Sequence, residues 1–344
     1  MSLRSFGLFT CIAALALMDT PVFAQQSGSN ATPQRQPDPA RVVQRVRAAD
    51  YKPPEGVDFR SVTIVSDGIR LHGEVFTPKG TPASQKLPAV VMAHGWGGVA
   101  AGLRNDAVDI ARAGYFVLVF DYRGWGESAS PIVMIDKEPL HEPGKAEPFT
   151  ARVQPLREYI NPLEQAEDWF SALDWIMGEP QVDANRVGVR GSSYSGGHVV
   201  YVAANDPRVK AVVSQVGGFT SRPSAGYEQP GRDMATKMAR GEIGYPAPRA
   251  APFAGLIGSP IGHKGARYAP VDEAVKVTAP TIIILVENEE YGGNPVAQVA
   301  YENLKGPKKL EILPGVTHYA VYSTERATVI RMAIEWFDKY LKGK

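Results

Sequence analysis

The sequence RVGVRGSSYSGG at residues 186–197 constrains the fold more than any other stretch of the chain. A strand-like run ends at Gly191, and an apolar run long enough to begin a helix follows. A serine on a sharp turn between strand and helix is typical of a nucleophile elbow, whose neighbours two positions away must be small. Ser193 meets this requirement, since Gly191 and Ser195 flank it at that spacing. A second register places Ser195 between Ser193 and Gly197, but we favour Ser193 because the strand pattern ends at Gly191.

Strand and helix patterns alternate along most of the chain. Asp67-Gly68 is a hairpin signal that joins two predicted antiparallel strands at 61–65 and 69–76. Further strands are predicted at the apolar runs 87–93, 115–120, 186–190, 209–216, 281–286 and 310–313. Helices are predicted at 103–111, from Asn161-Pro162, after Ser193, from Asn294-Pro295 and at 326–341. The alternation indicates an α/β fold with a mostly parallel sheet and helices on both faces.

Two long stretches interrupt this alternation. Residues 129–159 and 217–276 are rich in Pro, Gly and Arg and are too long for ordinary connections. We expect lids or pocket walls there, and we predict residues 217–276 as a lid insertion with a short helix at 234–239.

The amino-terminal region has the pattern of an export signal. One arginine precedes the apolar stretch 6–18, and small residues lead to Gln25. Residues 1–24 are therefore predicted as a cleaved signal peptide, which indicates a periplasmic or secreted protein. Residues 25–57 are mostly polar and rich in proline, so we predict a flexible leader. The only cysteine, Cys11, falls within the signal peptide, so the predicted mature chain has no thiol.

The length and net charge of the chain limit the classes of protein to which it can belong. With 344 residues, 44% of them hydrophobic, the chain can bury a large core, and we predict one domain over residues 58–344. A formal net charge of +1 gives no indication of a nucleic-acid partner. No apolar run reaches the roughly 18 residues that suggest a membrane span, so no span is predicted.

A serine hydroxyl is a weak nucleophile, so Ser193 needs a base that accepts its proton. In a sheet enzyme of this type, the base lies on the loop after the last strand. His318 is the only one of the six histidines just after that predicted strand. The other five lie after the third strand, on the elbow helix, on the first hairpin or in the insertions: His94, His198, His72, His141 and His263. We predict His318 as the base and His94 as a residue that fixes its own loop.

The base in turn needs a carboxylate that holds its tautomer. That acid is expected after the strand before last, where the sequence reads VENEEYGG from Val286. Three carboxylates compete there, and we favour Glu289 because it fits the apex of the loop. Glu287 still belongs to the strand end, and Glu290 leans into the next turn. The two that are not the acid are expected to form a solvated acidic turn.

An oxyanion hole would complete the constellation. The loop HGWGG follows the third predicted strand, where donors to the oxyanion belong in such a fold. We predict the backbone N–H groups of Trp96 and Tyr194 as these donors, because both would point at the charge that develops on a tetrahedral intermediate.

The chain resembles the serine α/β-hydrolase superfamily, particularly its dienelactone-hydrolase-like and prolyl-oligopeptidase-like branch. The segments that carry the resemblance are HGWGG, DYRGWGES, GSSYSGG, LVENEEYGG and PGVTHY, within roughly residues 58 to 342. The resemblance implies the α/β-hydrolase fold with an eight-stranded sheet whose second strand is antiparallel, and hydrolysis through an acyl-enzyme. Dienelactone hydrolases themselves use cysteine where Ser193 stands, so their activity is not implied. Many relatives have Asp where Glu289 stands.

We therefore predict a carboxylic ester hydrolase that acts on a small-molecule ester without a cofactor or metal. Amide or peptide hydrolysis is the alternative chemistry, because the same site serves both reactions. A catalytically inactive binding scaffold of the same fold is a further possibility, against which the complete triad chemistry argues.

A rival of another class is an NAD-dependent oxidoreductase. Gly95, Gly97 and Ala100 match a dinucleotide-binding fingerprint after a strand, and Asp121 ends the next strand where a ribose-binding acid is expected. This alternative leaves the elbow and the His318 loop unexplained, and we interpret Asp121 instead as a structural residue at a strand end.

Overall fold

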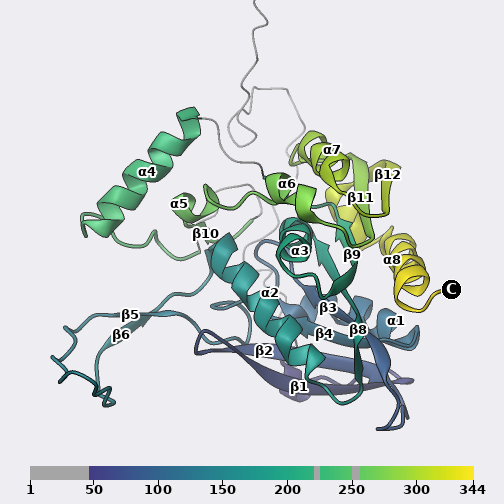
Figure 1. Cartoon of the computed structure of the whole chain (residues 1–344), viewed down its shortest axis with the longest axis horizontal. Coiled ribbons are helices and arrows are strands. Elements are labelled where there is room, and N and C mark those ends of the chain that lie inside the picture. The colour runs from purple at the N-terminus through teal and green to yellow at the C-terminus, as the bar shows by residue number, and fades with distance from the viewer. Residues whose placement is uncertain (1–45, 221–224, 250–255) are drawn as a thin grey trace, which may run out of the picture. The chain divides into compact units, whose positions relative to one another are not determined.

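The computed structural model describes residues 46–220, 225–249 and 256–344. Its centre is an eight-stranded sheet with helices on both faces (Figure 1). The strands, in spatial order, are β1 (Val57–Ser66), β2 (Ile69–Pro78), β4 (Phe116–Phe120), β3 (Leu87–Ala93), β8 (Val182–Ser192), β9 (Val209–Gln215), β11 (Thr281–Asn288) and β12 (Lys308–Thr317). β2 is antiparallel to both its neighbours, and all pairs from β4 to β12 are parallel. The predicted fold class and sheet topology are confirmed.

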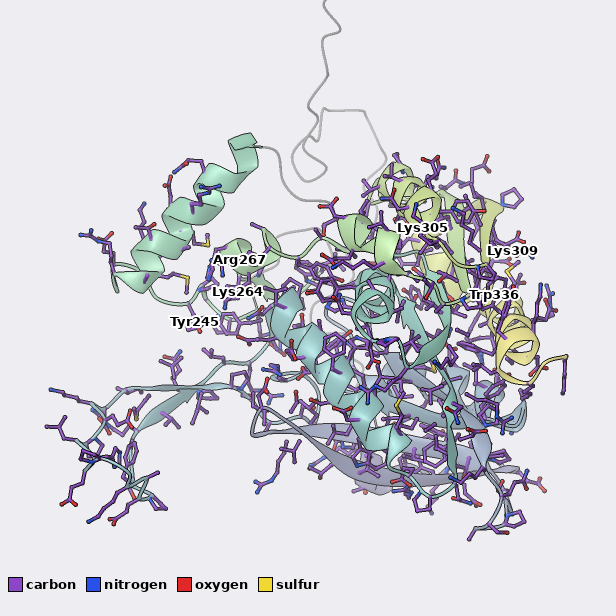
Figure 2. All side chains as sticks on the ribbon, viewed as in Figure 1. Tyr245, Lys264, Arg267, Lys305, Lys309 and Trp336 are labelled. Atoms are coloured by element: carbon purple, nitrogen blue, oxygen red, sulfur yellow. The ribbon has the colours of Figure 1, made fainter. Side chains whose placement is uncertain are left out.

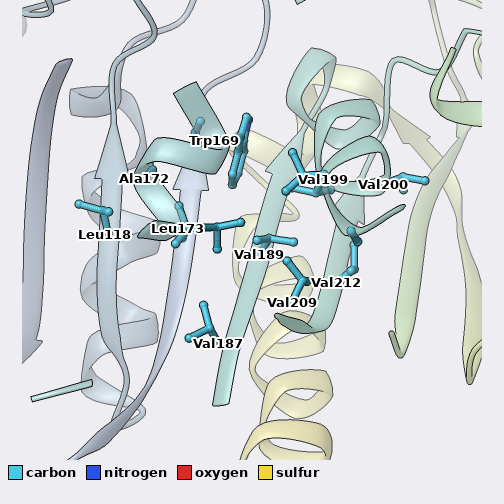
Figure 3. Close-up of a cluster of buried hydrophobic side chains, with 14 of the residues drawn as sticks. Leu118, Trp169, Ala172, Leu173, Val187, Val189, Val199, Val200, Val209 and Val212 are labelled. Atoms are coloured by element: carbon cyan, nitrogen blue, oxygen red, sulfur yellow. The ribbon is translucent and has the colours of Figure 1, made fainter. Parts of the chain in front are cut away.

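Five long helices pack on this sheet: α1 (Arg104–Arg112), α2 (Pro162–Met177), α3 (Tyr194–Asn205), α7 (Asn294–Asn303) and α8 (Arg326–Leu341). One buried cluster joins α2, α3 and α7 to one face, and a second joins α1 and α8 to the other. Trp169 and Leu173 of α2 lie over Val187 and Val189 of β8 in the first cluster (Figure 3). Strands covered on both faces are apolar at nearly every position, which is why they appear in the sequence as continuous apolar runs.

Two local sequence signals are confirmed by the backbone. Asp67 and Gly68 have φ angles of 47° and 80°, as a tight hairpin turn between β1 and β2 requires. Asn161 caps α2, and its side chain accepts the N–H of Glu164 at 3.4 Å. Pro162 occupies the first turn of that helix, where it displaces no hydrogen bond.

Both insertions contain their own short elements. Residues 129–159 form the hairpin β5 (Ile132–Met134) and β6 (Val153–Pro155), which extends away from the sheet (Figure 1). Its side chains stand largely clear of the rest of the protein, and Leu140 is 98% exposed (Figure 2). The described part of residues 217–276 contains α4 (Ala225–Ala239), β10 (Ser259–Pro260), α5 (Gly262–Gly265), α6 (Pro270–Glu273) and a 3-10 turn, η3 (Ala274–Lys276). The predicted helix at 234–239 is therefore the end of a longer helix.

The two insertions meet each other. β7 (Tyr159–Ile160), at the end of the first, pairs in parallel with β10 of the second. The Tyr159 hydroxyl also donates to the Pro246 carbonyl at 2.6 Å. These contacts connect the second insertion to the amino end of α2.

The predicted flexible leader extends too far toward the sheet. Residues 1–45, which include the predicted signal peptide, lie outside the described residues, but residues 46–57 pack on the domain. Tyr51 stacks edge-on against Phe59 at 4.9 Å, and the Arg104 guanidinium lies 4.4 Å from its ring centroid. Val57 already begins β1. Among residues 46–57, Ala48 and Val57 are buried and Tyr51 is partly buried, while most of the others are exposed.

No helix in the described part of the chain combines the length and the apolar character that a membrane span requires.

Candidate active site

Ser193 lies on a sharp turn between β8 and α3. Its backbone has φ 56° and ψ −126°, a strained conformation for a residue other than glycine. The Ser193 N–H donates to the Gln215 carbonyl of β9 at 2.9 Å, which anchors the turn. A β-carbon added at Gly191 would lie 2.0 Å from the carbonyl oxygen of Ser195, so the turn requires glycine there. The elbow geometry expected at Ser193 is present.

Ser195, the serine of the second register, has a different environment. Its side chain is fully buried, and its Oγ accepts the Ser192 N–H at 2.8 Å. Its hydroxyl donates to the Ala93 carbonyl of β3, also at 2.8 Å. These contacts fix the elbow on the neighbouring strand and leave Ser195 no access to a substrate, which favours the register with Ser193.

The loop after β12 brings His318 to Ser193. His318 Nε2 lies 3.1 Å from Ser193 Oγ, and His318 Nδ1 lies 2.9 Å from both carboxylate oxygens of Glu289. Because a carboxylate only accepts hydrogen bonds, this arrangement assigns the proton to Nδ1 and leaves Nε2 to accept from the serine hydroxyl. The His318 and Glu289 side chains are only 6% and 7% exposed, so water competes little with their contact.

Glu287 and Glu290 are exposed to solvent, as expected of an acidic turn, and each also accepts one backbone N–H. The Gly315 N–H donates to Glu287 Oε2 at 2.7 Å, and the His318 N–H donates to Glu290 Oε2 at 2.6 Å. Thus Glu287, near the end of β11, contacts β12 through Gly315, while Glu289 and Glu290, in the loop after β11, both contact His318. Sequence reasoning missed the contacts of Glu287 and Glu290 because each depends on the pairing of β11 with β12.

The predicted oxyanion loop follows β3 and approaches the nucleophile closely. A β-carbon added at Gly95 would lie 3.0 Å from Ser193 Cβ, so a larger residue there would have to displace the Ser193 side chain. The rings of Trp96 and Tyr194 meet edge-on with centroids 5.5 Å apart, which brings the two predicted donor residues together. Tyr194 is the first residue of α3, directly after Ser193.

Asp121, the acid of the dinucleotide fingerprint, serves the interior of the fold. Asp121 Oδ1 accepts the Ala100 N–H at 2.6 Å, and Oδ2 accepts the Glu127 N–H at 2.9 Å. Asp121 is 2% exposed, and this burial raises the pKa of its carboxyl group to about 6. Its oxygens are therefore unavailable to a ribose, and the structure contradicts the oxidoreductase alternative.

His94 and His198 are also structural. His94 Nδ1 lies 2.9 Å from the Gly95 carbonyl, and the Tyr122 N–H donates to Nε2 at 3.4 Å, which confirms the predicted role in fixing its loop. Complete burial lowers the pKa of His198 to about 4, and its Nδ1 contacts the Tyr194 carbonyl. The described residues contain no group of three or more His, Cys, Asp or Glu side chains placed to share a metal ion.

Two sequence comparisons show which known proteins this chain is similar to. The sequence model of the X-Pro dipeptidyl-peptidase family (S15 family) matches residues 67–236 of this chain. The quorum-quenching protein AidA of Acinetobacter baumannii is 34% identical over 191 residues, a match that covers 53% of this chain and 53% of AidA.

Solved structures share the fold. The α/β hydrolase GrgF from Penicillium sp. sh18 superposes with a TM-score of 0.63 at 19% identity, covering 83% of this chain and 99% of GrgF. An acetyl xylan esterase from Paenibacillus sp. R4 superposes with a TM-score of 0.57 at 21% identity, covering 83% and 85%. This chain therefore has the α/β-hydrolase fold, and part of its sequence is similar to the S15 family and to AidA.

Proposed function

We propose that this protein hydrolyses carboxylic esters of small molecules through an acyl-enzyme, with Ser193, His318 and Glu289 as the catalytic residues. The observation that carries the proposal is the unbroken contact from Ser193 Oγ through the His318 ring to Glu289. Nucleophile, base and orienting acid within hydrogen-bond reach of one another are the signature of an activated serine.

Each residue has a definite part in the proposed cycle. Ser193 Oγ attacks the ester carbonyl carbon while His318 Nε2 takes its proton, and the N–H groups of Trp96 and Tyr194 stabilise the oxyanion. His318 then gives the proton to the departing alcohol. For deacylation it takes a proton from the water that attacks the acyl carbon. It then returns this proton to Ser193 Oγ as the bond between Ser193 and the acyl carbon breaks and the carboxylic acid leaves. Glu289 stabilises the imidazolium in both steps.

The choice of ester substrates draws on the relatives. An acetyl xylan esterase shares the fold, and an ester has a better leaving group than an amide, so this site needs no further device to cleave it. Peptide hydrolysis is the second candidate, because the matching family model is that of X-Pro dipeptidyl-peptidases. Both candidates use the same three residues and differ in the substrate-binding walls.

We further propose that residues 217–276 form a lid and that the protein is exported. A β-carbon added at Gly97 would lie 2.8 Å from the Ile257 carbonyl, so the insertion packs directly on the proposed oxyanion loop. Export after cleavage before Gln25 rests on the sequence pattern of residues 1–24. Mass spectrometry of the mature amino terminus, after expression in a secreting host, tests the cleavage.

Substrate class and nucleophile are tested together. Wild-type protein should hydrolyse p-nitrophenyl esters with a higher kcat/KM than Gly-Pro-p-nitroanilide, and Ser193→Ala should lose at least about 10³-fold in kcat. A fluorophosphonate probe should label Ser193, which tryptic peptide mapping can distinguish from Ser195. Label on Ser195, or a faster anilide reaction, would contradict the nucleophile or the ester preference respectively.

A further inference from the structure

A hydroxyl–hydroxyl contact joins the two segments that carry the proposed nucleophile and base. The Ser192 and Tyr322 hydroxyl oxygens are 2.7 Å apart. Ser192 directly precedes Ser193, and Tyr322 is the last residue of η4 (His318–Tyr322), the 3-10 turn that begins with the proposed base. The contact therefore links the elbow to the histidine segment independently of the bond between Ser193 and His318.

The elbow end of this contact is held by a buried polar chain. Gln215 Nε2 donates to Ser192 Oγ at 3.0 Å, and Arg190 donates to Gln215 Oε1 at 2.9 Å. Arg190 also pairs with Asp106 of α1 at 3.1 Å. Ser192, Gln215 and Arg190 are each at most 2% exposed, so water cannot replace these partners. Ser192 Oγ is thus a fixed point beneath the elbow.

The turn η4, which carries Tyr322, is followed by α8, and α8 contacts the same polar network through α1. Arg326, the first residue of α8, lies 3.4 Å from Asp106 and 2.6 Å from Asp109 of α1. Tyr322 is 38% exposed as a whole residue, but its hydroxyl meets Ser192, which is 2% exposed.

We propose that Tyr322 is a positioning residue that sets the distance between His318 Nε2 and Ser193 Oγ by tying η4 to Ser192. His318 lies directly after β12, which is the edge strand of the sheet. The connection to β12 therefore holds the histidine segment from one side only. The Tyr322–Ser192 bond adds a constraint from β8, the strand that carries the nucleophile. A misplacement of about 1 Å between reacting groups can cost on the order of 100-fold in rate.

A second tyrosine of the same turn provides the matched control. The Tyr319 hydroxyl lies 2.6 Å from that of Tyr291, on the loop after β11. Both partners of this bond are exposed, Tyr319 at 50% and Tyr291 at 36%, whereas the Tyr322 bond ends on the buried Ser192, so water replaces the Tyr319 bond more readily. Tyr319→Phe removes one hydroxyl from the same turn without touching the buried chain.

The inference rests on the proposed function, so the test includes a readout that does not depend on the choice of substrate. We would compare wild type, Tyr322→Phe, Ser192→Ala, their double variant and Tyr319→Phe by ester kcat and KM and by the rate of fluorophosphonate labelling at Ser193. Circular dichroism at the assay temperature establishes the folded fraction of each. Should Tyr322→Phe not fold, Ser192→Ala removes the same bond from the other side and carries the test.

Tyr322→Phe and Ser192→Ala should each lower kcat and the labelling rate by about tenfold with KM within about twofold, because ground-state binding does not depend on the bond. The double variant should be no slower than about twofold below either single variant, as expected for two ends of one interaction. Tyr319→Phe should stay within about twofold of wild type.

The two ways to fail are distinct. If wild type is not labelled at Ser193, the proposed function falls. If wild type is labelled and Tyr322→Phe is labelled at the same rate, or if the effects of the two single variants simply add, the proposed function stands and the positioning role of Tyr322 is overturned.

Discussion

Two histidine–carboxylate pairs lie at the same edge of the sheet, each at the ends of neighbouring parallel strands. His94 follows β3 and Asp121 follows β4, and their nearest oxygen and nitrogen, Oδ1 and Nε2, are 4.0 Å apart. Glu289 follows β11 and His318 follows β12, and there both carboxylate oxygens lie 2.9 Å from Nδ1. The sequence contains the same residue types at equivalent places, but the environments differ.

The difference lies in what else each side chain contacts. Both oxygens of Asp121 accept backbone N–H groups, and His94 is bonded within its own loop, so this pair builds the loops after β3 and β4. Glu289 has one such backbone contact, from the Tyr291 N–H at 3.1 Å, and otherwise faces the imidazole. His318 Nε2 then faces Ser193. The imidazole of His318 faces the elbow and can act as a base there. The pair of His94 and Asp121 is enclosed by backbone groups and instead stabilises the fold.

The largest expected effect separates the two histidines. His318→Asn should lower ester kcat by about 10⁴-fold or more, because it removes the proposed base. The melting temperature should change less than in His94→Asn, because residue 318 keeps its backbone bond to Glu290. His94→Asn should lower the melting temperature clearly while kcat per folded molecule falls by about tenfold at most, since it removes a buried ring packed 4.7 Å from Tyr122. Equal losses of kcat in the two variants, measured at the same folded fraction, would remove the distinction.

A smaller effect separates the three glutamates. Glu289→Gln should lower kcat by about 10² to 10⁴-fold, because an amide stabilises the imidazolium poorly and its N–H₂ group can impose the wrong tautomer. Glu290→Gln and Glu287→Gln should lower kcat by about tenfold or less, since an amide oxygen still accepts the N–H groups of His318 and Gly315. Steady-state kinetics of the three variants on one ester checks the order. Three equal losses would sink the assignment of Glu289.

The smallest effect concerns the pH dependence of stability. Burial raises the pKa of Asp121 to about 6 from 3.8, so between these values the native state binds more protons than the unfolded chain does. The stability that this group contributes is therefore fully present below about pH 4 and is lost as the pH rises through about 6. Asp121→Asn removes this titration, so the free energy of unfolding of wild type minus that of the variant should shrink as the pH rises from 4 to about 6.5. Urea denaturation across this range measures the difference, and a value independent of pH would contradict the burial of Asp121.

Much of the fold could be predicted because its signals are local. The apolar runs, the hairpin at Asp67-Gly68 and the cap at Asn161 each reflect a preference of a few adjacent residues, and the structure has all three where they were expected. The small residues around Ser193 likewise report a backbone turn that only they permit. The contacts of Tyr51 with Phe59 and Arg104 fall within the predicted leader, and no local sequence pattern indicates them.

The sequence by itself determined the order of strands and helices, the elbow at Ser193 and the short set of candidates for base and acid. The tertiary structure decided which carboxylate faces His318, that Glu287 and Glu290 accept backbone N–H groups of Gly315 and His318, and that Tyr322 meets Ser192. The physical reason is distance along the chain: these contacts join loops that sheet pairing brings together across dozens of residues. Residue preferences act over a few positions, whereas the order of β8, β9, β11 and β12 in the sheet is set by the packing of the whole domain.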